Sequence, residues 1–302
     1  MTELIAKPRP TPNTMGQFVR RDVLRGGEQI TGNIWRLPLS DSVIERANVG
    51  VKRGELPEGY ALAGGAARNC LEALVHPDVT IPSPRDIDLV YWGKSDGFDG
   101  RVADELARRF SPRDFAYGHG VGVIGDLAEY MNSRDFTINQ VLSTGGAIYV
   151  TIPAVRDAEK YRIRPTVFEH GRDYPLGDKL ALKAVRLLAE YRAGGVEEAD
   201  IYGIDLRRRH NDIRDFWHAL ILDKALELGD DVAREYLRLL GTYDMHPAPS
   251  LWRRQPLDVY KEVLRHTDFA PSATVKEMLK GGDRERRLRA MGLMGKTAAK
   301  RG

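Results

Sequence analysis

The sequence predicts an α+β protein in which a small mixed-sheet head is followed by an all-helical body. Short apolar segments alternate with glycine and proline turns in the first half, whereas helical periodicity dominates after Pro175. The chain has 302 residues, which suits two domains because single cores stop growing at about 250–300 residues. We therefore expect an arm over 1–40, a head over 41–175 and a helical neck and body over 176–302.

Turn residues and apolar spacing predict the elements of the head. Residues 1–40 are rich in proline, glycine and arginine, so we expect an extended, loosely attached arm. Ser40 or Asp41 can cap a helix, since apolar residues at helical spacing follow directly. The predicted elements are a helix over 41–50, a strand over 60–63, a helix over 66–75, a loop over 76–84, a strand over 86–92, a helix over 100–110 and a strand over 120–124.

The second half of the chain reads as a series of helices. Its final stretch, 276–301, is basic, and two interpretations remain open for it: an exposed helix face or a contact with RNA phosphates. The predicted helices cover 178–193, 205–227, 230–241, 256–266 and 272–289.

Composition excludes several classes of protein. The single cysteine, Cys70, rules out a disulfide framework and a zinc site made of thiolates, and it indicates the reducing cytoplasm. The sequence holds no stretch of about 18 apolar residues and no apolar run after its start, so we expect neither a membrane span nor a secretory signal. The net charge of +3 is only weak support for a nucleic-acid partner.

The candidate chemistry begins with Asp86-Ile87-Asp88. Side chains alternate along a strand, so the two carboxylates are expected on one face while Ile87 anchors the strand in the core. Two neighbouring carboxylates repel each other unless a cation lies between them or one is protonated. Mg²⁺ prefers such oxygen ligands and takes the remainder from water and phosphate. On its own, however, an Asp-x-Asp pair is weak evidence, because it is more typical of a solvated surface.

A glycine pair upstream strengthens this interpretation. Gly64-Gly65 joins a predicted strand to a predicted helix, and Arg68 follows one turn later. Glycines allow close approach of a ligand, and amides at the start of a helix hold phosphate, which Arg68 can also reach. The plainer alternative is a tight strand–helix turn. A phosphate cradle together with a metal dyad suits a nucleoside triphosphate.

Three segments, Gly64–Arg68, Asp86–Leu89 and Arg134–Asn139, stand in the order found in class II CCA-adding enzymes and bacterial poly(A) polymerases, and the sequence resembles that family. The resemblance implies a nucleotidyltransferase head with two Mg²⁺ ions, or Mn²⁺ in their place, on Asp86 and Asp88. It implies an NTP substrate, ATP and/or CTP, and an RNA 3′ end as acceptor.

The same resemblance assigns roles to individual residues. The run Arg134-Asp135-Phe136-Thr137-Ile138-Asn139 resembles the sugar side of the family's nucleotide pocket, so Arg134, Asp135 and Asn139 join Gly64, Gly65 and Arg68 as candidate nucleotide-binding residues. The segment 178–188 resembles the helix that reads the incoming base, which adds Asp178 and Arg186. Residues 149–165, with Asp157, are similar to the flexible segment before that helix.

The sequence departs from the family at four places. Asn69 stands where the family has Asp, and the loop 76–84 is longer than usual. The family's extra strands before Arg134 are missing; Asp126 and Glu129 are the candidates for a third carboxylate, although both are more typical of surface residues. The base-reading Glu and Arg fall at Gly177 and Ala181, which puts the usual selection of C and then A in doubt.

The leading functional hypothesis is transfer of a nucleoside monophosphate from an NTP to the 3′ end of a tRNA-type or other small RNA, with release of pyrophosphate. Two alternatives stand beside it. One keeps the chemistry but uses a protein or a small molecule as acceptor. The other is a catalytically decayed RNA-binding module.

Overall fold

The computed structural model describes residues 23–84, 86–93, 97–110, 121–166, 178–204, 206 and 215–245. The described chain forms two compact units. The first contains the residues up to Lys160, apart from the gaps just given, and the second begins at Tyr161. Both helices and strands are present, which confirms the predicted α+β class.

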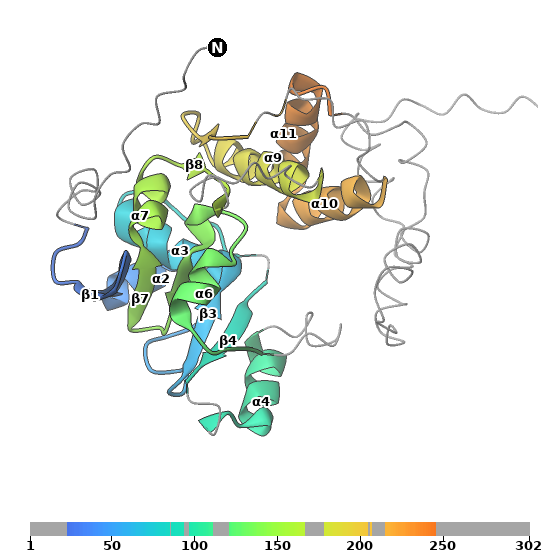
Figure 1. The fold of residues 1–302 in the computed structure, drawn as a ribbon. Helices are drawn as coiled ribbons and strands as arrows, with labels where there is room; N and C mark the ends of the chain where they lie inside the picture. Colours follow the sequence, from blue (N-terminus) through green and yellow to red (C-terminus); the bar gives the residue numbers. More distant parts are fainter. Residues whose placement is uncertain are drawn as a thin grey trace, which may run out of the picture. The chain divides into compact units, whose positions relative to one another are not determined.

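A seven-stranded mixed sheet forms the centre of the first unit, counted over the described residues. Its strand order is β1-β2-β7-β6-β3-β4-β5, and neighbours are antiparallel except β4 and β5, which run parallel. The order places β3 and β4 side by side, with β5 at the edge beyond β4 (Figure 1). The strands are β1 (Glu28–Thr31), β2 (Ile34–Pro38), β3 (Tyr60–Ala63), β4 (Asp88–Trp92), β5 (Gly122–Ile124), β6 (Val141–Ser143) and β7 (Ala147–Thr151).

Helices cover both faces of this sheet. One apolar core contains side chains of α2 (Asp41–Ala47), α3 (Gly64–Val75), α4 (Gly100–Phe110) and α7 (Ile152–Glu159). A smaller core forms against α6 (Leu127–Asn132). Strand alternation separates them: on β3, Tyr60 and Leu62 belong to the first core, and Ala61 and Ala63 to the second. The strand β3 is therefore buried on both faces, which explains its continuous apolar run.

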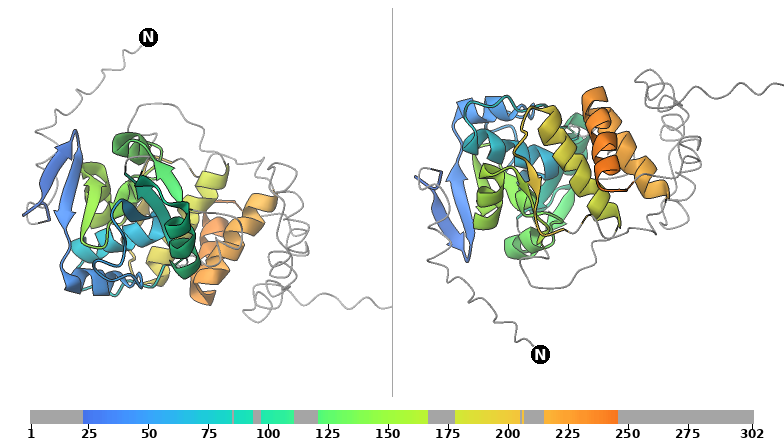
Figure 2. Two further views of the ribbon diagram at one scale, coloured as in Figure 1. Left: turned by 90° about the horizontal axis from the view of Figure 1, so that it is seen from below. Right: turned by 90° about the horizontal axis from the view of Figure 1, so that it is seen from above.

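The arm predicted over 1–40 is partly wrong. The structure places β1 and β2 in the sheet, and β2 pairs with β7 over five residues, from Ile34↔Thr151 to Pro38↔Ala147. Figure 2 shows this hairpin at the edge of the first unit. The strand β2 buries Ile34 and Leu37, so it is held by packing as well as by its ladder. Residues 1–22 lie outside the described part of the chain.

Several local predictions are confirmed. The helix predicted from 41 is capped by Ser40, whose hydroxyl accepts a hydrogen bond from the Val43 amide at 3.3 Å. The strand predicted over 60–63 and the helix predicted over 100–110 have the expected bounds. Other boundaries move: the helix predicted over 66–75 begins at Gly64, and the strand predicted over 86–92 begins at Asp88.

The described part of the second unit is mainly helical, as expected. The helices α9 (Asp178–Ala193), α10 (Asp215–Leu228) and α11 (Asp230–Thr242) pack against one another. A short parallel ladder of β8 (Arg162–Ile163) and β9 (Asp200–Ile201) was not predicted. Of the helix predicted over 205–227, the structure describes the part from Asp215, and the helices predicted over 256–266 and 272–289 and the basic stretch 276–301 lie outside the described residues.

Two composition-based expectations can be compared with the structure. Cys70 is buried at 1% exposure, and this burial raises the pKa of its thiol to about 11. Such a thiol stays protonated at neutral pH and is a poor nucleophile. Within the described ranges, no helix has the length and apolar character that a membrane crossing requires.

Candidate functional site

The site is built where β3 turns directly into α3. Ala63, the last residue of β3, lies opposite Asp88 in the antiparallel ladder with β4. Gly64 follows with a φ of 55°, a left-handed conformation that favours glycine. A side-chain carbon added to Gly64 would overlap Oδ2 of Asp88. The glycine therefore allows the Asp88 carboxylate to lie directly against the start of α3.

The beginning of α3 is suited to an anion. Ala63 at the N-cap provides no side-chain hydrogen bond, and the first turn contains no acidic residue. The first amides of a helix point out of its end and carry a partial positive charge. A carbon added to Gly65 would have its nearest contact at 3.9 Å, on Cβ of Pro84, so open space remains beside these amides. Phosphate is the kind of group that such a helix start binds.

Three of the predicted nucleotide-binding residues form a connected network. Nη1 of Arg68 on α3 donates to Oδ1 of Asn139 at 3.4 Å. Nδ2 of Asn139 donates in turn to Oδ1 of Asp135 at 2.8 Å. Arg68 also forms an ion pair with Glu72 at 3.4 Å on its own helix. The structure thus joins Arg68 to the Arg134–Asn139 run, which the sequence placed together only by resemblance.

A short 3-10 turn, η2 (Thr137–Asn139), carries this run. Oδ1 of Asp135 accepts from the Phe136 amide at 2.9 Å, which fixes the start of the turn. The hydroxyl of Thr137 donates to Oδ2 of Asp157 at 2.6 Å, and both side chains are fully buried. Asp157 also pairs with Arg156 at 3.5 Å. The segment 149–165, which resembles the family's flexible segment, contains the end of β7 and all of α7, and α7 packs against η2.

Tyr130 of α6 is a site residue that sequence reasoning missed. The Arg134 guanidinium lies over its ring, with Cζ at 4.1 Å from the ring centroid. Burial raises the pKa of the Tyr130 hydroxyl; the positive charge of Arg134 opposes the shift, whereas Asp88 and Asp135 add to it. These four side chains therefore share one environment. The four-residue spacing of Tyr130 and Arg134, one helical turn, was the available sequence signal.

The candidate metal ligands are Asp86 and Asp88. Asp88 is exposed at the first position of β4, and Asp86 is half-buried just before the strand. Ile87 packs against the larger core, as predicted for the anchoring residue. No group of three metal-binding side chains occurs among the described residues. Two carboxylates nevertheless fit Mg²⁺, which takes one or two from a protein and completes its shell with water and phosphate.

Asp126, one of the two candidates for a third carboxylate, caps a helix. Oδ1 of Asp126 accepts a hydrogen bond from the Glu129 amide at 2.7 Å and so caps α6. Glu129 itself is exposed in the first turn of that helix. Neither side chain joins Asp86 and Asp88 in a metal-binding group within the part of the chain that the structure describes.

The structure gives a physical reason for Asn69. This side chain is buried at 5% exposure, and its amide nitrogen donates to the backbone carbonyls of Ala47 at 3.2 Å and Pro82 at 2.8 Å. It thereby ties α3 to α2 and to the loop 76–84. A carboxylate has no hydrogen to donate, so the Asp of the family would not make these contacts.

The last two candidates, Asp178 and Arg186, belong to α9 in the second unit. Arg186 forms an ion pair with Glu190 and lies near the fully buried Tyr236, whose pKa is raised by burial. The Asp178 side chain is outside the described set. Ala181, at the family's base-reading position, is fully buried. The base-reading roles of Asp178 and Arg186 stay predictions.

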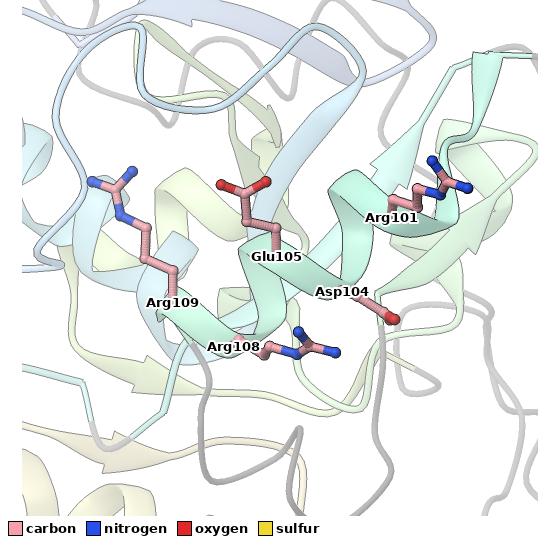
Figure 3. Close-up of a pocket in the computed structure, with 5 residues that line it drawn as sticks. All are labelled: Arg101, Asp104, Glu105, Arg108 and Arg109. Atoms are coloured by element: carbon pink, nitrogen blue, oxygen red, sulfur yellow. The ribbon is translucent and has the colours of Figure 1, made fainter.

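A hollow elsewhere on the first unit does not extend this site. It is lined by Arg101, Asp104, Glu105, Arg108 and Arg109, all on α4. Figure 3 shows Glu105 and Arg109 leaving one side of the helix and Asp104 and Arg108 another, so the charges do not converge. Arg109 is already paired with Glu55 at 2.8 Å. None of the five residues is a predicted site residue.

Comparisons with known proteins add one structural similarity. No family model matches the sequence, and no curated protein matches it. Among solved structures, the chain is similar to a CCA-adding enzyme in complex with CTP, with 16% sequence identity and a TM-score of 0.45. That match covers 88% of this chain and 68% of the other. A similarity this weak assigns no function, which is therefore inferred from the residues of the site.

Proposed function

We propose that the first unit is a metal-dependent nucleotidyltransferase. It transfers a nucleoside monophosphate from an NTP to the 3′ end of an RNA and releases pyrophosphate. The observation that carries this proposal is the contact between the Asp88 carboxylate and the start of α3 at Gly64. A metal-binding oxygen and a phosphate-binding helix start then lie side by side, which is what a metal–triphosphate complex requires.

The binding steps are assigned to the chain's own groups. The amides at Gly64 and Gly65 would hold phosphate oxygens, with Arg68 one turn further along α3. Asn139 and Asp135 would orient the sugar, since their side chains are already joined to each other and to Arg68. This preorganisation lowers the entropy cost of aligning the α-phosphorus with an attacking hydroxyl.

Asp86 and Asp88 would hold the Mg²⁺ ions. Bound there, Mg²⁺ would neutralise charge on the phosphates and lower the pKa of the attacking hydroxyl. The open surroundings of Asp88 leave room for the phosphate and water oxygens that complete the metal's shell. Mn²⁺ has the same preference for oxygen ligands and would substitute.

The acceptor and the base are the finer parts of the proposal. An RNA 3′ end, as in tRNA or another small RNA, is the acceptor that the sequence motifs favour, in the cytoplasm that the single buried cysteine suits. The buried Ala181 leaves α9 without the family's arginine for base selection. We therefore expect the enzyme to add mainly one nucleotide, from ATP or from CTP, and not to add both in a fixed order.

A transfer assay tests the proposal directly. The protein is incubated with each labelled NTP separately, Mg²⁺ and a mixed pool of small RNAs. The variant Asp86→Ala/Asp88→Ala should lose transfer. The matched control Asp78→Ala/Asp104→Ala removes two exposed carboxylates away from the site and should keep it.

Each outcome of the assay has a defined meaning. Label in RNA that depends on Asp86 and Asp88 supports the full proposal. Label in protein or in a small molecule would keep the chemistry and replace the RNA acceptor. If no NTP delivers label to any acceptor, the nucleotidyltransferase proposal is wrong, and binding of RNA without transfer would indicate the decayed module.

A further inference from the structure

Tyr130 occupies a fixed position beside the proposed site. Its side chain is 5% exposed. It belongs to the smaller core, with Leu127 and Met131 of its own helix and Ala61 and Ala63 of β3. A ring packed on both its helix and the sheet has little freedom to move. Whatever rests on this ring is therefore held at a defined place.

The side chain that rests on it is Arg134. Its Cζ lies 4.1 Å from the ring centroid, within the range of a cation–π contact. Its Nη2 donates to Oγ of Ser133 at 3.0 Å, and Oγ of Ser133 donates to the carbonyl of Tyr130 at 2.8 Å. The guanidinium is thus fixed from two directions by the end of α6.

Arg134 is held without being neutralised. Among the residues that the structure describes, it makes no ion pair with a carboxylate. The tyrosine ring is uncharged at neutral pH, because an ordinary tyrosine hydroxyl has a pKa of about 10. An acidic residue in place of Tyr130 would pair with the guanidinium and cancel its charge. The neutral ring leaves the full charge available to an anionic ligand.

The surroundings indicate which anion this would be. Tyr130 packs with Ala63 in the smaller core, and Ala63 lies directly opposite Asp88 in the ladder of β3 and β4, where paired side chains share one face of the sheet. The cation held by Tyr130 therefore lies near the proposed metal ligand, and the electrostatic effect of Asp88 on the Tyr130 hydroxyl agrees with this. A polyphosphate carrying Mg²⁺ satisfies both charges at once, because the metal meets the carboxylate and a phosphate oxygen meets the guanidinium.

We propose that Tyr130 is a positioning residue that holds Arg134 for the polyphosphate of the incoming nucleotide. This inference rests on the proposed function and deepens it. It assigns phosphate to Arg134, where the sequence motif suggested the sugar. Tyr130 acts through Arg134 alone and touches no reacting atom.

The test is a double-mutant cycle read by titration calorimetry on the full chain. The probes are Mg²⁺ with ATP, with CTP and with inorganic tripolyphosphate, which lacks sugar and base. Tyr130→Leu should weaken all three by about 2- to 30-fold, the range of a cation–π contact. Tyr130→Phe keeps the aromatic face and should bind like wild type. In an Arg134→Ala background, Tyr130→Leu should have no further effect.

A second variant separates this role from a general loss of packing. Leu127→Ala opens the same core from the same helix but leaves the ring under Arg134, so it should lower stability without changing tripolyphosphate affinity. An equal loss in Tyr130→Phe, or an undiminished effect of Tyr130→Leu without Arg134, would overturn the inference while leaving the proposed function intact. If the wild-type protein binds none of the three probes, both the inference about Tyr130 and the proposed function are wrong.

Discussion

The substitution Gly64→Ala tests the contact on which the proposed function depends. Gly64 has a φ of 55°, and a left-handed backbone costs alanine about 1–2 kcal/mol of stability. In addition, the new methyl group would overlap Oδ2 of Asp88. Since the Asp88 side chain can rotate, we expect its carboxylate to turn away from the start of α3. The overlap should therefore lower activity, and the loss of stability should be limited to the backbone cost.

Gly54→Ala is the matched control. Gly54 also has a positive φ, 78°, but a carbon added there would meet nothing within 4 Å. It should therefore lose the same stability, about 1–2 kcal/mol, without affecting the site. The difference between the two variants isolates the contact with Asp88.

Nucleotide transfer and urea unfolding are measured on both variants. Perturbing the groups around a metal site typically costs about 10–100-fold in affinity or activity, so Gly64→Ala should lose at least this much. Both variants should unfold at similar urea concentrations. Wild-type transfer by Gly64→Ala, with its stability lowered only as in Gly54→Ala, would refute the argument that Asp88 must lie against α3.

Three further changes test the supporting structure. Asn69→Asp introduces the residue of the family that the sequence resembles but removes the donor to two backbone carbonyls, so it should destabilise by about 1–3 kcal/mol in urea unfolding, unlike the exposed control Asn33→Asp. Burial raises the pKa of Cys70 from 9.0 to about 11, so stability should be full below pH 9 and fall by about 2–3 kcal/mol as the pH rises to 11. Cys70→Ala should remove the part of the fall that Cys70 causes and leave the part due to buried tyrosines such as Tyr130, whose pKa burial also raises; an unchanged pH profile would contradict this prediction. Thr137→Val removes the donor to the buried Asp157 carboxylate and should cost about 1–3 kcal/mol; retained stability would show that η2 is held by other contacts.

Much of the first unit followed from local signals. The cap at Ser40, the strand over 60–63 and the helix over 100–110 are encoded by residues a few positions apart, which is why periodicity and capping rules find them. Boundaries beside glycines were less certain: α3 starts at Gly64, because glycine can take the left-handed conformation that lets the strand turn straight into the helix.

Sequence reasoning did not find the short strand β2 or the hydrogen-bond partners of Asn69. β2 is five residues long and gains its stability from β7, more than a hundred positions later in the chain. The Gly32-Asn33 turn before it is a local hairpin signal, but the pairing of β2 with β7 depends on residues far along the chain. Similarly, the sequence showed Asn69 only as a departure from a motif. Its role became clear from the hydrogen bonds that it donates to the backbone carbonyls of Ala47 and Pro82.

The sequence by itself determined the order of the motifs, the α+β class and the candidate ligands Asp86 and Asp88, because these depend on residue type and short spacing. Only the tertiary structure decided what those residues meet. It brought Arg68 to Asn139 across 71 positions and set Asp88 against Gly64. Such contacts depend on how the sheet orders its strands and on which face each helix covers, and no local pattern in the chain encodes either.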